Sequence, residues 1–219
     1  MGLLNTIRSG VLELIFPSLC LSCGKRGTFL CDSCLSGSPA AERECAEWIF
    51  PIFDYRHPPI KKSVHMLKYK GRKQLAKIFA DSMHARILEE LSDLSIMQNF
   101  RDPLLIPIPL SFSRYRERGF NQAEIICKEL VKLGAENFIL VKNVLFRKDS
   151  AKHQAHIENR AERLRNIIGS FYTKNENLIK GRNIILIDDV ITTGATLTEA
   201  KKILKNAGAR KIIAVTCAH

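Results

Sequence analysis

Two adjacent carboxylates, followed by a loop of small hydroxylated residues, form the most informative chemical pattern in this sequence. Asp188 and Asp189 come directly after four apolar, mostly β-branched residues of the kind found in buried parallel strands. In the loop that follows, backbone N–H groups and hydroxyls can surround a phosphate. Two carboxylates repel a phosphate, so they should face another part of the ligand, and vicinal hydroxyls, with or without Mg²⁺, meet that need. The loop residues are Thr192, Thr193, Gly194, Ala195 and Thr196.

A phosphate loop of this kind depends on the strand before it and the helix after it. Residues 184–187 predict a buried strand, and an apolar stripe at 197–207, ended by Gly208, predicts the helix. In open α/β sheets, ligands bind outside the carboxyl ends of the strands, where this loop would lie. The alternative is a buried strand that ends in a solvated turn. The paired acids in register with Thr-Thr-Gly-x-Thr favour the phosphate site.

Alternating strands and helices surround this motif. Apolar runs predict strands at 48–55, 104–108, 138–145 and 211–216, and apolar residues at helical spacing predict helices at 75–91 and 123–133. This alternation is typical of an α/β fold with a doubly wound parallel sheet. The first 16 residues predict a short amphipathic helix that packs on the domain.

Four of the seven cysteines occur as two Cys-x-x-Cys pairs with seven residues between them. Four thiolates at this spacing can close a tetrahedral Zn²⁺ site, and a closed site of this type is structural. The alternative is a disulfide or redox pair, but the sequence lacks a secretion signal, and disulfides are rare in a reducing cytosol. We therefore expect a zinc-binding module at 1–45, including the N-terminal helix, and a larger domain at 46–219. The ligands would be Cys20, Cys23, Cys31 and Cys34.

Positive charge is concentrated in one part of the chain. The formal net charge is +12, and residues 55–80 contain eight Lys and Arg, no acid, and interleaved aromatic residues. Such a stretch suits a phosphate backbone with unstacked bases, although it could also reach a small anion or form a solvated helix face. The predicted nucleic-acid contacts are Lys61, Lys62, Lys68, Lys70, Arg72 and Lys73, together with Arg116 farther along the chain.

Length and composition restrict the possible functions. The 219 residues suffice for one medium domain with a small appendage, and no apolar run is long enough to span a bilayer. We therefore expect a cytoplasmic protein. An ATP-driven motor is disfavoured because the GxxxxGK[ST] phosphate loop of such enzymes is absent from the sequence.

Three motifs in a fixed order resemble the ComF family of bacterial competence proteins, including the related GntX-type proteins. They are the paired Cys-x-x-Cys, an Ile-Pro-Ile-Pro run followed by Arg-x-Arg-x-Arg-Gly-Phe-Asn-Gln, and residues 184–196. The last motif resembles the phosphoribosyl pyrophosphate (PRPP) signature of type I phosphoribosyltransferases over all thirteen residues. The resemblance implies that fold, with an N-terminal zinc finger and a role in DNA uptake.

The resemblance also implies roles for individual residues. Asp188 and Asp189 would be the catalytic pair on the ribose hydroxyls of PRPP and its Mg²⁺, and residues 192–196 would surround the 5′-phosphate. From an extended segment, Arg114 and Arg118 could supply charge to the pyrophosphate, while Arg116 is assigned to nucleic acid and a purely structural role for the three arginines stays open. Segment 147–166, with Gln154 and Arg160, could form a lid.

Two functions of different classes follow. The first is a competence protein that binds PRPP and handles single-stranded DNA, with an ATP-dependent DNA translocase as a candidate partner. The second is a phosphoribosyltransferase that moves phosphoribose from PRPP to an unknown acceptor without a direct DNA role.

Overall fold

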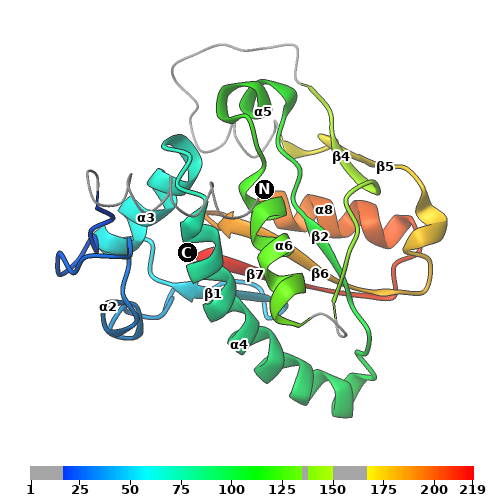
Figure 1. Ribbon diagram of the computed structural model, residues 1–219. Helices are drawn as coiled ribbons and strands as arrows, with labels where there is room; N and C mark the ends of the chain where they lie inside the picture. Colours follow the sequence, from blue (N-terminus) through cyan, green and yellow to red (C-terminus); the bar gives the residue numbers. More distant parts are fainter. Residues whose placement is uncertain (1–16, 135–137, 150–166) are drawn as a thin grey trace, which may run out of the picture.

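A five-stranded sheet, parallel throughout, forms the centre of the protein (Figure 1). The computed structural model describes residues 17–134, 138–149 and 167–219. Because all five strands run in the same direction, their carboxyl ends meet at one edge of the sheet. The strand order is β1 (Ile49–Phe53), β7 (Lys211–Ala218), β6 (Asn183–Val190), β2 (Leu104–Pro107) and β3 (Ile139–Leu140).

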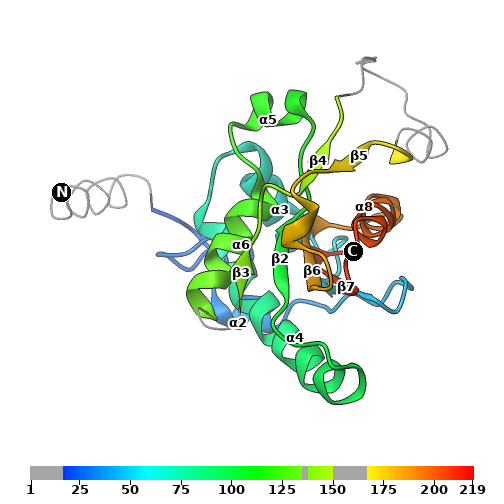
Figure 2. The same ribbon diagram turned by 90° about the vertical axis from the view of Figure 1, so that its right-hand side faces the viewer.

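Helices cover both faces of this sheet (Figure 2). One face packs against α4 (Gln74–Gln98) and α6 (Gln122–Leu133), with α3 (Pro58–Tyr69) on the same side. The other face packs against α8 (Ala195–Asn206) and an antiparallel hairpin of β4 (Leu145–Arg147) and β5 (Phe171–Thr173). The remaining short elements are α2 (Asp32–Ser36), α5 (Phe112–Arg118) and a 3₁₀ turn, η1 (Glu176–Leu178).

The apolar residues of β6 divide between the two faces. Ile185 and Ile187 join the core beneath α4 and α6, whereas Ile184 and Leu186 join the core beneath α8. A strand buried on both sides must be apolar at every position, which is why this stretch shows no polar alternation. These observations confirm the predicted doubly wound parallel α/β fold. Among the described helices, none has the length and apolar character needed to cross a membrane.

The cysteine module packs directly on the larger domain. Cys20, Phe29 and Leu30 belong to the same buried cluster as α3 and α4. The chain after the last of the four paired cysteines also pairs with the sheet edge, since Ala40 forms a bridge with Phe53. The division at residue 45 stays a prediction, and the predicted helix at 1–16 lies outside the described residues.

The structure differs from the sequence predictions at three places near the carboxyl edge. Strand β6 continues through Val190, so the paired acids lie inside the strand rather than after it. The strand predicted at 138–145 is instead two short strands, because the chain leaves β3 through the polar residues Lys142 and Asn143 and pairs again as β4 in another sheet. The arginine-rich segment is helix α5, not extended chain, and the carboxylate of Asp149 accepts the N–H of Phe112 in its first turn.

Candidate functional site

The loop between β6 and α8 has the geometry expected of a phosphate site. Gly194 caps α8 with φ at +73°, a left-handed conformation that strongly favours glycine. The first turn of α8 offers backbone N–H groups without helical acceptors, together with the positive end of the helix dipole. Thr192 and Thr193 are exposed, and the side chain of Thr193 accepts a weak hydrogen bond from the N–H of Ala195 at 3.4 Å. The loop can therefore receive an anion from solvent.

Asp189 is buried and already has two partners. One of its carboxylate oxygens lies 2.8 Å from the ammonium of Lys68, at the last turn of α3. The other accepts a hydrogen bond of 2.9 Å from the amide of Gln122, the first residue of α6. Burial is the largest single effect on Lys68 and opposes its charge, but the charge and hydrogen bond of Asp189, together with the charge of Asp188, outweigh it and raise the pKa of Lys68. Asp189 thus joins three elements at the sheet edge.

Asp188 lies beside this ion pair and is held differently. One of its oxygens accepts the backbone N–H of Asp189 at 2.8 Å. Burial, together with the negative charge of Asp189, raises the pKa of Asp188 to about 7, although Lys68 acts in the opposite direction. Since Lys68 neutralises Asp189, the two acids and this lysine carry a net charge of about −1 once Asp188 is ionised. That arrangement tolerates a nearby phosphate better than two free carboxylates do.

A polar hollow of about 230 Å³ adjoins Lys68 and brings it near one of the predicted arginines. The guanidinium of Arg118 lies 4.8 Å from the ring centre of Tyr69 and donates to its hydroxyl at 3.1 Å. The Nε of Arg118 is buried without a hydrogen-bond partner among the described residues. Lys68 and Arg118 therefore line one hollow from α3 and α5, as an anionic leaving group would require.

The other predicted cations occupy different surroundings. Arg114 and Arg116 are exposed on α5, where the helical spacing places Arg114 and Arg118 on one side and Arg116 on another. Lys68 is mostly buried, so the structure sets it apart from the other lysines of its stretch. The other predicted DNA contacts in that stretch are exposed, namely Lys61 and Lys62 on α3, and Lys70, Arg72 and Lys73 in the turn before α4.

The four paired cysteines converge on a single point. Their sulfur atoms all lie within 4.8 Å of one another, and Cys31 is 3.8 Å from Cys20 and 3.7 Å from Cys23. A tetrahedral zinc site with Zn–S bonds of about 2.3 Å has sulfur–sulfur edges of about 3.8 Å. All of these cysteines are free thiols, so the disulfide alternative is wrong. The residues fit a closed metal site, in agreement with the sequence prediction.

The backbone around Cys20 favours its thiolate form, whereas at Cys34 the hydrogen bond with Ser22 is outweighed by those with Cys23 and Cys31, which raise the pKa of Cys34 to about 11. Burial opposes ionisation of Cys20, but hydrogen bonds from the backbone of Cys23, Cys31 and Ser22 lower the pKa of Cys20 to about 6. Its sulfur accepts the N–H of Cys31 at 3.5 Å. A cluster that begins partly ionised at neutral pH is suited to bind a divalent cation.

Three contacts at the site were not anticipated from the sequence. Lys68 was assigned to DNA rather than to Asp189, and Gln122 was part of a motif without a role. His219 is buried, and its Nε2 lies 3.3 Å from the carbonyl oxygen of Thr192. Only the position of Gln122 directly after the Arg-Gly-Phe-Asn motif offered a signal. The proposed lid residues Gln154 and Arg160 lie outside the described residues.

Several known proteins resemble this chain over much of its length. Residues 116–219 match the phosphoribosyl transferase domain family. The chain is 28% identical over 199 residues to DNA utilization protein YhgH of Salmonella typhimurium, covering 89% of this chain and 81% of that protein. It is 34% identical over 161 residues to Competence protein ComFC of Streptococcus pneumoniae, covering 74% and 63%. It is 28% identical over 218 residues to Competence protein F of Haemophilus influenzae, covering 95% and 88%.

Among solved structures, a hypoxanthine phosphoribosyltransferase from Staphylococcus aureus aligns with a TM-score of 0.37 and 12% identity, over 64% of this chain and 62% of that one. The family match includes α6, the hairpin and the entire loop between β6 and α8. The aligned regions cover most of this chain. The alignment with Competence protein F covers 95% of it and therefore includes the four paired cysteines. These similarities support a ComF-family protein with a phosphoribosyltransferase domain of type I fold.

Proposed function

We propose that this chain is a ComF-type competence protein that binds PRPP with Mg²⁺ and handles single-stranded DNA in the cytoplasm during DNA uptake. The observation that carries the PRPP assignment is the loop after β6, where a Gly194-capped helix N-terminus lies next to Asp188. Anion-binding N–H groups and a hydroxyl-binding carboxylate stand side by side, as a ribose phosphate requires. The names of the relatives support the DNA role.

Each part of PRPP has a matching part of the site. Residues 192–196 would hold the 5′-phosphate, and Asp188 would accept hydrogen bonds from the ribose hydroxyls. Lys68 and Arg118 would face the pyrophosphate, with Arg114 as a further cation on the same side of α5. Their positive charge would stabilise the pyrophosphate if it leaves.

The two acids differ in whether a carboxylate oxygen is free to bind Mg²⁺. Both oxygens of Asp189 are already engaged by Lys68 and Gln122, whereas a single oxygen of Asp188 accepts the N–H of Asp189. Mg²⁺ prefers carboxylate oxygens together with substrate phosphates, so Asp188 would be its protein ligand when PRPP is bound. The ion would neutralise charge on the pyrophosphate. In the cysteine module, Cys20, Cys23, Cys31 and Cys34 would hold a structural Zn²⁺.

Calorimetric titration of the zinc-loaded protein with PRPP and Mg²⁺ tests the first part of the proposal. Saturable binding is expected for the wild type, and Asp188→Asn should lower the affinity at least tenfold. Asp102→Asn is a matched control, because this residue precedes β2 at the opposite edge of the sheet. Absence of PRPP binding by the wild type, or equal affinities for both variants, contradicts the PRPP assignment.

The exposed cations around the α3–α4 turn support the DNA part of the proposal. Lys70, Arg72 and Lys73 are exposed there, and the guanidinium of Arg72 lies 5.4 Å from the ring centre of Phe29 in the cysteine module. This contact joins the metal module to the basic surface. An ATP-dependent DNA translocase would be a partner, since the chain has no motor motif of its own.

Salt-dependent DNA binding distinguishes this surface from nonspecific charge. Lys70→Gln with Lys73→Gln should weaken binding of a single-stranded oligonucleotide and flatten the dependence of affinity on salt. Lys128→Gln with Lys132→Gln removes the same charge from α6, where both lysines pair with glutamates, and should change little. Equal effects of the two double variants contradict a localised DNA surface.

A phosphoribosyltransferase with an unknown acceptor is the second candidate function. Lys68 and Arg118, which share a hollow beside the acids, favour it because a departing pyrophosphate needs such charges. The release of pyrophosphate from PRPP when an acceptor is added would distinguish a transferase from a protein that only binds PRPP. This release should be lost in Asp188→Asn.

A further inference from the structure

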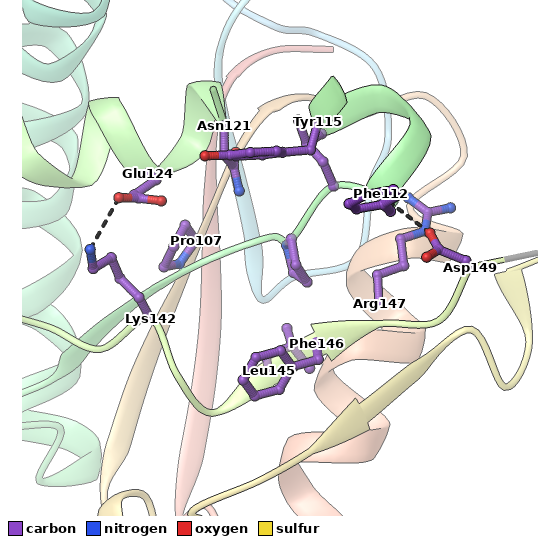
Figure 3. Close-up of a pocket in the computed structure, with 12 residues that line it drawn as sticks. Pro107, Phe112, Tyr115, Asn121, Glu124, Lys142, Leu145, Phe146, Arg147 and Asp149 are labelled. Carbon is purple, nitrogen blue, oxygen red and sulfur yellow. Dashed lines mark hydrogen bonds and ion pairs between the residues drawn. The ribbon is translucent and has the colours of Figure 1, made fainter. Parts of the chain in front are cut away.

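A second pocket, of about 360 Å³, lies between α5 and β4 and shares no lining residue with the hollow at Lys68 (Figure 3). Tyr115 and Phe112 project into it from α5, and Leu145 and Phe146 face them from β4. Pro107, at the end of β2, lies between these two groups. The pocket is therefore a slot with an aromatic residue on each side, of a size that takes one small ligand.

The walls of this pocket are held in place without a ligand. Asp149 accepts the backbone N–H of Phe112 at 2.8 Å, which joins α5 to the end of β4. The ring of Phe146 stacks on Tyr172 of the partner strand with their centres 5.4 Å apart. Nevertheless, Phe112 is 60% exposed and Tyr115 is 49% exposed. Two large aromatic side chains held at the surface beside a preformed slot are costly to leave in water, and such features mark binding sites.

The polar groups of the pocket suit a flat heterocycle better than a hydrocarbon. Glu124 and Lys142 form an ion pair of 3.2 Å at one end, and Arg147 and Asp149 lie at the other (Figure 3). Asn121 lies beside Tyr115, where its amide donates to the carbonyl of Ile108 and accepts the N–H of Ala123, so it shapes this wall rather than offering a free group. Donors and acceptors at the edges of an aromatic slot match the edges and π-faces of a nucleobase.

The charge around the slot indicates that the base belongs to a nucleic-acid strand. Arg114 and Arg116 are exposed on the same short helix as the two aromatic residues, and the guanidinium of Arg116 lies 5.8 Å from the ring centre of Phe112. Alternating aromatic and cationic side chains on one element stack bases and neutralise the neighbouring phosphates.

We infer that the α5–β4 pocket takes one unstacked nucleobase of single-stranded DNA, with Arg116 on an adjacent phosphate. The inference rests on the proposed DNA role and adds to it a place where a base, rather than the backbone alone, is contacted. The phosphate contacts of the α3–α4 turn would then be the sequence-independent part of the same interaction.

Binding of a short oligonucleotide with a single 2-aminopurine, whose fluorescence reports stacking, tests this site. Tyr115→Leu removes the ring and should weaken binding about tenfold, within the range measured for a single base–aromatic stack. Tyr115→Phe keeps the ring and should bind within twofold of the wild type. The salt dependence should be the same for all three proteins, because no phosphate contact is lost. Both variants alter a half-exposed residue, and circular dichroism checks that they are folded.

An oligonucleotide of the same length with abasic sites provides the second arm. It should bind the wild type about as weakly as the normal strand binds Tyr115→Leu. If the wild type binds the normal and abasic strands equally, the inference is overturned while the DNA role stands. If the wild type binds neither strand, the DNA role itself fails. If a free deoxynucleotide binds as tightly as the strand and Tyr115→Leu abolishes this binding, the pocket is a mononucleotide site and the assignment to DNA is overturned.

Discussion

Asp188→Asn should make the protein more stable at alkaline pH, although the same change should impair PRPP binding. Burial and the neighbouring Asp189 raise the pKa of Asp188 to about 7 from an ordinary value of 3.8. Asparagine has the same shape, carries no charge, and retains an oxygen that can accept the N–H of Asp189. The substitution therefore removes the cost of ionising Asp188 in the folded protein and preserves its contact.

The sign and size follow from the two pKa values. Between pH 4 and pH 7 the folded protein binds a proton at Asp188 that the unfolded chain has already lost, so the free energy of unfolding falls as pH rises through this window. A difference of about three pKa units corresponds to roughly 4 kcal/mol once the pH exceeds both values. The stability advantage of Asp188→Asn should therefore be near zero at pH 4 and approach this limit at pH 8.

Urea denaturation followed by circular dichroism at several pH values measures this difference. Asp54→Asn is the control, because hydrogen bonds from Arg56 lower the pKa of Asp54 to about 2. Its carboxylate stabilises the fold above the unfolded pKa, so removing it should bring no gain at pH 8. A constant difference between wild type and Asp188→Asn across the range, or a loss of stability in the variant at pH 8, would refute the reasoning.

Three further predictions concern the ion pair, the metal and the loop. Lys68→Met leaves the buried carboxylate of Asp189 without its ion-pair partner and should lower the free energy of unfolding by roughly 3 kcal/mol. In a double-mutant cycle measured by urea denaturation, adding Asp189→Asn should restore more than half of this loss. If the effects of the two substitutions simply add, the two side chains do not stabilise each other. Removal of metal by a chelator should lower the melting temperature by several degrees, because the cysteine cluster shares a core with α3 and α4. The chelator should release one metal ion per chain from the wild type. Cys23→Ser should have the lowered melting temperature even when no chelator is added. Gly194→Ala should lower the free energy of unfolding by about 1 kcal/mol and weaken PRPP binding, because the new side chain meets no severe contact but the backbone φ is +73°. An unchanged affinity for PRPP would mean that this loop does not bind the phosphate.

Local patterns in the sequence were enough to predict the fold and the central loop. A run of apolar residues buried on both faces, two acids and a small-residue loop are encoded within a few consecutive positions, as are the paired cysteines. The convergence of those cysteines follows from two short turns. Each of these features depends on contacts between residues that are close in the chain.

The partners of the acids depended on contacts that no local pattern encodes. Lys68 resembled its basic neighbours in the sequence, but the packing of α3 on the core turns it inward to Asp189, whereas Lys61 and Lys62 point to solvent. Gln122 reaches the same carboxylate from the first turn of α6. Which side of a helix faces the core can be read from periodicity, but which group lies opposite it is decided by how the layers pack.

The α5–β4 pocket also arose from the tertiary structure alone. The sequence indicated an extended arginine-rich segment and a continuous strand at 138–145, and neither predicts a slot. Because the segment is helical and the strand leaves the sheet, Tyr115 and Phe146 come to line one pocket. The sequence by itself determined the strands of the sheet, the small-residue loop after Asp189 and the four-cysteine cluster, since these rest on short-range order. The tertiary structure decided which charges are neutralised and which aromatic residues meet, since these rest on long-range packing.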